Sequence, residues 1–177
     1  MRNIVNRINK GFSLIELFAV ILAIAALAAM ALPSYRSYIA RARLVEVISI
    51  LESHLNEAKK EYIRTGAVPT SVLGIPNRVN TAYTDSKYIA YIYYDNGSLW
   101  TNTNAAMVKA IVSANVGNGI DGFVAGTSGA HNTVALAFAL EGDQLAFYCG
   151  SWVVDGSEIP LEYLPKGCQD TDINNLI

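Results

Sequence analysis

An apolar run near the start of the chain constrains the fold more than any other feature. Across residues 12–32 only Ser13 and Glu16 are polar. As a helix, this run spans about 30 Å, which matches the hydrocarbon thickness of a bilayer. The chain has 177 residues and is 52% hydrophobic, which is apolar for a soluble domain, and this run accounts for most of that apolar excess. The other residues are typical of one ordinary globular domain. The simplest interpretation is an uncleaved anchor that crosses a membrane once.

The residues before this run are basic. Residues 1–11 contain Arg2, Arg7 and Lys10 and no acid. Positive charge next to a membrane span favours the cytoplasmic side, so we expect residues 1–11 to stay there. An ordinary secretory signal has a shorter apolar core that ends in small residues, whereas this run is long and is followed by Pro33.

Glu16 is the exception inside the apolar run. A carboxylate in a membrane span costs about 2.5–3.5 kcal/mol on insertion scales, so such a residue is by default functional and needs a partner. Residues 17–32 offer no polar side chain, and we expect no good partner within the chain. A cut between Gly11 and Phe12 would create an α-amino group one helical turn before Glu16. Amine and carboxylate of neighbouring copies could then neutralise each other.

The residues around this position resemble a known family. The string GFSLIEL at residues 11–17 resembles the leader-peptidase site of type IV pilins, and LPSY at 32–35 and YIARAR at 38–43 extend the similarity. The resemblance covers about the first 45 residues. It implies a leader peptide at residues 1–11, cleavage between Gly11 and Phe12, and N-methylation of Phe12. It also implies that Glu16 meets the Phe12 amine of an adjacent subunit.

Apolar residues continue beyond the run at helical spacing. They occur at i, i+3, i+4 and i+7 and define one stripe: Leu44, Val47, Ile48, Leu51, Leu55, Ala58 and Tyr62. Gly66 followed by Pro69 predicts the helix end. Pro33 removes one backbone hydrogen bond, so we expect it to kink or loosen the helix without ending it. One helix of about 80 Å is predicted over residues 12–64, membrane-spanning over 12–32 and amphipathic over 33–64.

Residues 65–177 predict a globular head, which makes the fold class α+β. Residues 65–87 read as a surface connection, and residues 88–148 as an antiparallel sheet. Its expected strands are 88–94, 99–103, 133–141 and 144–148, with turns at 95–98 and 142–143. Residues 107–116 are apolar and fit either a helix or a strand, of which a strand is favoured. A loop is expected at 117–132. One apolar face of this sheet needs a cover, and the amphipathic stripe can supply it. A long helix packed on an antiparallel sheet is also the fold that the resemblance to pilins implies.

Two cysteines near the end of the chain predict one further constraint. Behind a membrane-export signal, Cys149 and Cys168 read as one disulfide; buried thiols or a metal half-site are less favoured alternatives. Residues 164–168 resemble the end of the disulfide-bonded loop of type IVa pilins, which contributes to adhesion in some members. The 149–168 loop is apolar here. Its residues Trp152, Val153, Val154, Ile159, Leu161 and Tyr163 either pin it to the sheet edge or form a subunit or receptor surface.

Catalytic or cofactor-binding patterns are not evident, so we expect neither an enzyme nor a metal or cofactor site. His54 and His131 lie far apart in the sequence, and no HExxH, CxxC or phosphate-loop motif occurs. Asp170 and Asp172 are too few for a calcium site and are expected to be solvated.

Charge argues against general DNA binding. Without residues 1–11 the chain has ten basic and fifteen acidic side chains, a charge of −5. Arg36, Arg41 and Arg43 form a basic cluster beyond the apolar run. We expect it to contact other subunits or lipid headgroups before DNA.

The resemblance implies a structural subunit of a type IV pilus, anchored in the inner membrane and then polymerised into an extracellular filament. Such filaments serve adhesion, twitching motility or DNA uptake. The implied partners are copies of the chain itself, the prepilin peptidase and methyltransferase, the pilus assembly machinery and minor pilins. A host receptor and DNA are further candidates. The alternatives are a pseudopilin of type II secretion and a surface binding module that is only tethered by its helix.

Overall fold

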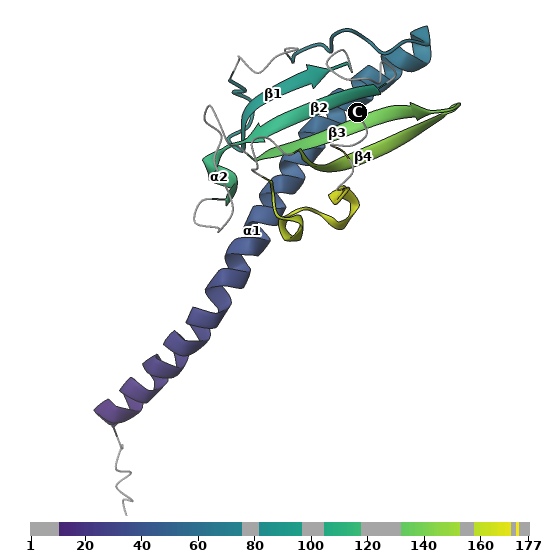
Figure 1. Ribbon diagram of the computed structural model, residues 1–177. Helices are drawn as coiled ribbons and strands as arrows, with labels where there is room; N and C mark the ends of the chain where they lie inside the picture. Colours follow the sequence, from purple (N-terminus) through teal and green to yellow (C-terminus); the bar gives the residue numbers. More distant parts are fainter. Residues whose placement is uncertain are drawn as a thin grey trace, which may run out of the picture. The chain divides into compact units, whose positions relative to one another are not determined.

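The computed structural model describes residues 11–75, 82–96, 105–117, 132–152, 158–170 and 173. The chain divides into two units, Met1–Arg36 and Ser37–Ile177. Helix α1 (Leu14–Thr65) contributes residues to both units, and the strands that follow it belong to the second (Figure 1).

The first unit is helical from Leu14 and apolar on all sides. Over residues 14–36 every side chain of α1 is exposed. This part of the helix is long and apolar enough to cross a membrane, judged by its length and composition. The predicted helix is therefore confirmed, although it begins two residues after Phe12.

In the second unit, α1 presents the predicted stripe to a core. Its buried residues are Ala40, Leu44, Val47, Ile48, Leu51, Leu55 and Ala58. The helix ends at Thr65 because Gly66 adopts a left-handed conformation with φ 73° and donates its N–H to the carbonyl of Tyr62 at 2.8 Å. Glycine takes this conformation without steric cost, as the sequence predicted for this helix end.

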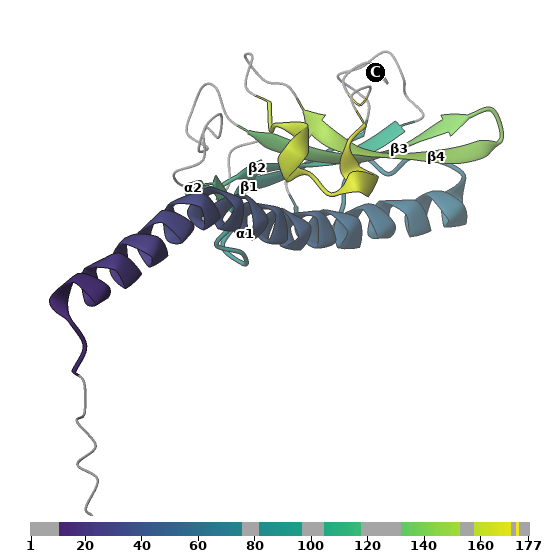
Figure 2. The ribbon, with the colours of Figure 1, turned by 90° about the horizontal axis from the view of Figure 1, so that it is seen from below.

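Among the described residues, the sheet has four antiparallel strands in sequence order: β1 (Ile89–Asp95), β2 (Ala105–Val112), β3 (Thr133–Glu141) and β4 (Gln144–Trp152). Strands β3 and β4 form the predicted hairpin, with Gly142 at φ 64° in its two-residue turn. The residues of α1 that belong to this unit lie along one face of the sheet (Figure 2).

Two strand predictions need correction. The strand that pairs with β1 is β2, whereas the predicted return strand 99–103 lies outside the described residues. The strand predicted at 107–116 ends at Val112, and α2 (Ala114–Gly117) follows. Ser113 explains the change, because its side chain accepts the backbone N–H of Asn115 at 3.3 Å and caps this helical turn.

The face of the sheet toward α1 carries the main core. Alternate residues of β2 and β3, such as Val108, Leu136 and Phe138, pack with the helix stripe. The Phe138 ring lies 6.0 Å from that of Tyr62, a favourable separation for tilted aromatic rings. Burial on this face confirms the predicted pairing of stripe and sheet.

The opposite face, called the outer face here, is buried as well. A second small core of Met107, Ala135, Ala137 and Ile173 lies there, with Tyr148 and Trp152 packed against it. The sequence analysis predicted a cover for one apolar face only. Burial on both faces explains their continuous apolar sequence.

The connection after α1 is less solvent-exposed than predicted for residues 65–87. Val72 and Ile75 are buried and form a short β-bridge with each other. Their side chains join the main core, so this part of the connection packs with the helix and the sheet.

Truncating the centre of the stripe should test this packing. Leu51 is fully buried, and Leu51→Ala should lower the free energy of unfolding by about 2–5 kcal/mol. Val45 lies on the exposed side of α1 and is the matched control. Val45→Ala should change the free energy of unfolding by less than about 0.5 kcal/mol. Denaturant unfolding of the detergent-solubilised chain, followed by tryptophan fluorescence, measures both. Equal effects would contradict the assigned orientation of the helix.

Candidate functional site

The start of α1 is organised by a reciprocal pair of hydrogen bonds. The backbone N–H of Ser13 donates to Glu16 Oε2 at 2.9 Å, and the backbone N–H of Glu16 donates to Ser13 Oγ at 3.3 Å. This is a capping box, which satisfies two N–H groups that a helix terminus otherwise leaves without partners. It explains why the helix begins at Leu14.

The expectation that Glu16 has no good partner within its own chain is therefore wrong. The spacing Ser13-x-x-Glu16 before an apolar run is itself a signal for a capping box and could have been read from the sequence. A glutamine can make the same bond, however, so capping alone does not require the negative charge of Glu16.

Gly11 and Phe12 precede the helix. Phe12 is 85% exposed, and a β-carbon added to Gly11 would meet no atom within 4 Å. Packing in the described chain therefore gives no reason for a glycine at position 11. A requirement for this small residue would have to come from a partner molecule.

The described surface of the first unit is predominantly apolar. Its exposed large side chains occur on every side of the helix: Phe12, Leu14, Ile15, Leu17, Phe18, Val20, Ile21, Leu22, Ile24, Leu27, Met30, Leu32 and Tyr35. A helix that is apolar all round requires a membrane or other helices as cover. Pro33 lies within α1, and the kink predicted there stays a prediction.

Two arginines of the predicted basic cluster bind the head of their own chain. Arg41 donates to the carbonyl of Glu162. Arg43 donates to the carbonyl of Asn115 at 2.6 Å, and its guanidinium lies 5.7 Å from the ring centre of Tyr88. These contacts attach loops to α1, an intrachain role that the sequence did not reveal.

The structure contains the expected disulfide between Cys149 on β4 and Cys168. Cys168 ends η2 (Lys166–Cys168), and η1 (Leu161–Tyr163) lies earlier in the loop. Ile159, Tyr163 and Leu164 are buried in the main core, which supports the interpretation that the apolar loop is pinned to the sheet. Leu161 is 38% exposed, and Val153 and Val154 lie outside the described residues.

Asp170 is exposed, as the sequence predicted, and it is also hydrogen-bonded. The backbone N–H of Cys149 donates to Asp170 Oδ2 at 3.0 Å, and the backbone N–H of Asp170 donates to the carbonyl of Cys149 at 3.0 Å. Asp170 therefore continues the pairing of β4 just beyond the disulfide. Asp172 lies outside the described residues.

A buried ion pair on the outer face was not anticipated. Lys109 Nζ lies 3.6 Å from Asp95 Oδ2, and both side chains are almost fully buried. The ammonium also lies 3.7 Å from the ring centre of Trp152, within cation–π distance. Burial lowers the pKa of Lys109 to about 8, and the nearby Asp95 carboxylate opposes this effect. The available signal was a lone charge within an apolar strand, AAMVKAIV.

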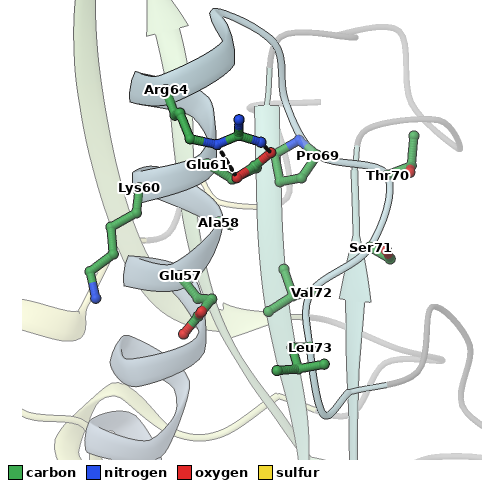
Figure 3. Close-up of a pocket in the computed structure, with 10 residues that line it drawn as sticks. All are labelled: Glu57, Ala58, Lys60, Glu61, Arg64, Pro69, Thr70, Ser71, Val72 and Leu73. Atoms are coloured by element: carbon green, nitrogen blue, oxygen red, sulfur yellow. Dashed lines mark hydrogen bonds and ion pairs between the residues drawn. The ribbon is translucent and has the colours of Figure 1, made fainter.

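A hollow of about 450 Å³ lies between the end of α1 and the connection that follows it. Figure 3 shows the ion pair of Glu61 and Arg64 on its helical side, with Val72 and Leu73 on the side of the connection. Its ten lining residues include neither histidine nor cysteine. His54 lies elsewhere on α1, and His131 is outside the described residues.

These features define the pilin fold: an N-terminal helix that is apolar and then amphipathic, an antiparallel sheet on its second half, and a C-terminal disulfide. The chain is similar over 93% of its length to pilins. It is 28% identical to the type IV major pilin protein PilE1 of Neisseria gonorrhoeae, over 96% of that protein. It is 27% identical to the fimbrial protein EcpC of Eikenella corrodens, over 93% of that protein.

A third relative is a fimbrial protein of Neisseria meningitidis serogroup A, 26% identical over 96% of its length. No protein-family model matches the chain. Fold and relatives together make the chain a homologue of type IV pilins.

The buried ion pair predicts a specific pH dependence. Between pH 8 and about 10.5 the folded chain binds fewer protons at Lys109 than the unfolded chain, so the free energy of unfolding rises with pH. From pH 7 to 9.5 we expect a gain of about 1–2 kcal/mol that is absent in Lys109→Met. Denaturant unfolding at each pH measures it. The same pH slope in both proteins would contradict the assignment.

Proposed function

We propose that the chain is a structural subunit of a type IV pilus and polymerises through the first part of α1. The observation that carries the proposal is the exposed, all-round apolar surface of residues 14–32 in a chain whose relatives are named pilins and fimbrial proteins. A membrane covers such a surface before assembly, and the same segment of other subunits covers it in a filament.

Before assembly, the apolar segment anchors the chain in the inner membrane, with residues 1–11 on the cytoplasmic side. A prepilin peptidase cuts between Gly11 and Phe12, and the new terminus is N-methylated. The open space around Gly11 and the exposure of Phe12 support access by such an enzyme. The assembly machinery and minor pilins then move the subunit into an extracellular filament.

Cleavage gives Glu16 a second partner. An α-amino group has an ordinary pKa of about 7.7–8.0 and is largely charged at neutral pH. A carboxylate has about four acceptor sites, so Glu16 can keep the bond from Ser13 and still accept the Phe12 amine of a neighbouring subunit. Joining the two charges within an apolar filament core would set the register between subunits.

The alternatives differ in what becomes of the helix. A pseudopilin of type II secretion shares this helix and leader, whereas the names of the relatives and the Cys149–Cys168 disulfide favour a pilin. A tethered binding module would remain a monomer in the membrane. Adhesion, twitching motility and DNA uptake are the roles that a pilus of this kind would serve.

Filaments sheared from cells should contain this chain. Their subunits should begin at N-methylated Phe12, because assembly follows cleavage and methylation. Intact-mass and N-terminal peptide spectrometry check both features. A chain found only in membranes, with residues 1–11 still attached, would support the tethered module.

Substitutions at Glu16 and Ser13 separate charge pairing from helix capping. Glu16→Gln keeps a side chain able to cap the helix but loses its charge, so cleavage and insertion should be retained while filament yield falls about tenfold or more. Ser13→Ala removes the capping hydroxyl at a cost of about 1 kcal/mol and should leave yield near wild type.

Immunoblots of sheared filaments and of membranes measure yield and cleavage for both variants, with Glu16→Ala as a variant that lacks both functions. Normal filament yield from Glu16→Gln would refute the charge pairing. A larger loss in Ser13→Ala than in Glu16→Gln would assign the role to capping instead.

A further inference from the structure

One edge of the sheet is formed by β4. In the strand order of the described sheet β4 comes last, with β3 on one side of it (Figure 1). On its other side the backbone N–H and C=O of Cys149 bond to Asp170. Backbone groups alternate in direction along a strand, so those of Leu145 and Phe147 point the same way as those of Cys149. Within the described part of the chain, no backbone hydrogen bond reaches Leu145 or Phe147 from that side.

This stretch of β4, residues 144–148, lacks the devices that normally protect a strand edge. Its sequence is QLAFY, which contains neither a charged residue nor a proline. Proteins usually place such residues on edge strands, because unpaired N–H and C=O groups readily pair with another strand. Phe147 is also 50% exposed. We call residues 144–148 the open edge, and it is suited to pairing with one more strand.

A hollow of about 300 Å³ lies between α1 and the open edge. Glu52 lines it from α1, Phe147 from β4, and Asp170 from the residues that follow the disulfide. Its nine lining residues include two carboxylates and neither lysine nor arginine. Among the described residues, Glu52 and Asp170 form no ion pair. The hollow therefore suits a positively charged group.

The apolar part of the lining narrows the kind of cation further. It consists of Leu55, Leu136 and Phe147. A lysine or arginine side chain can lay its methylene groups on such a surface while its charged end stays near carboxylates. Phe147 already accepts one cation, because the Lys59 ammonium lies 4.5 Å from its ring centre.

We propose that the open edge and the hollow together bind an extended segment of a partner protein that carries a lysine or arginine. The segment pairs with the backbone of Leu145 and Phe147 as an added strand. Its basic side chain enters the hollow near Glu52 and Asp170. The backbone bonds hold any extended chain, whereas the two carboxylates select for positive charge. These features belong to the head alone, so the inference does not rest on the proposed pilus function.

A pair of peptides tests the charge preference. The probes are fluorescein-labelled peptides TVKVT and TVEVT with blocked ends, and fluorescence anisotropy measures their binding to the full-length chain in detergent. TVKVT should bind about tenfold or more tightly than TVEVT, because glutamate replaces attraction to the carboxylates by repulsion. Glu52→Gln should reduce this preference about threefold or more. Equal affinities for the two peptides in the wild type, or an unchanged preference in Glu52→Gln, would overturn the proposal.

A proline tests the backbone pairing. Leu145→Pro removes an N–H that the sheet does not use, so β4 should still pair with β3 while the affinity for TVKVT falls about tenfold. Leu145→Val is the matched control and should bind like the wild type. Urea unfolding of both variants shows whether the head remains folded.

Modified peptides test the same pairing on the wild-type chain. Two forms of TVKVT are methylated on alternate backbone nitrogens, one form on the valines and the other on the remaining residues. Only alternate N–H groups of an added strand face its neighbour, so one form should bind and the other should lose about tenfold or more in affinity. Equal binding of both forms would overturn the pairing. A chain that binds neither form nor TVKVT, but forms dimers that Leu145→Pro abolishes, would assign the open edge to a second copy and refute the proposed partner.

Discussion

The structure depends on one helix that must be covered in two different ways. From Ser37 onward α1 has a single apolar stripe, and the sheet of the same chain buries it. Before Arg36 the helix is apolar on all sides, and the described chain buries none of its side chains there. Hydrophobic burial scales with the apolar area removed from water, so the first part gains its stabilisation only with a membrane or other subunits. This division suits a subunit that is first held in a membrane and then packed among copies of itself.

Much of this organisation could be predicted from the sequence because it rests on local pattern. The helical spacing from Leu44 to Tyr62 gave the buried face of α1, and Gly66 gave its end. The disulfide and the β3–β4 hairpin were also foreseen. These predictions succeeded because periodicity, turn glycines and cysteine pairing depend on residues near one another in the sequence or on unique partners.

The failures have a common physical cause. The partner of β1 could not be chosen locally, since pairing depends on which apolar strand completes the sheet. The outer-face core joins Met107, Ala135 and Ile173 across long sequence distances. The hydrogen bonds of Asp170 were missed because its partner is the backbone of Cys149, which has no sequence signature. The capping box of Ser13 and Glu16 was a local signal and could have been read.

The head thus has three kinds of closure around one sheet. A helix covers one face, a disulfide fixes the loop at the edge strand, and the residues after the disulfide lie on the other face. The buried pair of Lys109 and Asp95 lies on that second face, where the ammonium rests on the ring of Trp152. Burying an ion pair costs desolvation energy, which the attraction between its two charges and the contacts around it must offset.

The central claim is that Glu16 of one subunit meets the Phe12 amine of another. Zero-length carbodiimide coupling of sheared filaments tests it, because only an amine and a carboxylate in contact are joined. After tryptic digestion the account predicts two copies of peptide 12–36 linked through Phe12 and Glu16. A peptide linked only within one chain, or no link at all in intact filaments, would contradict it.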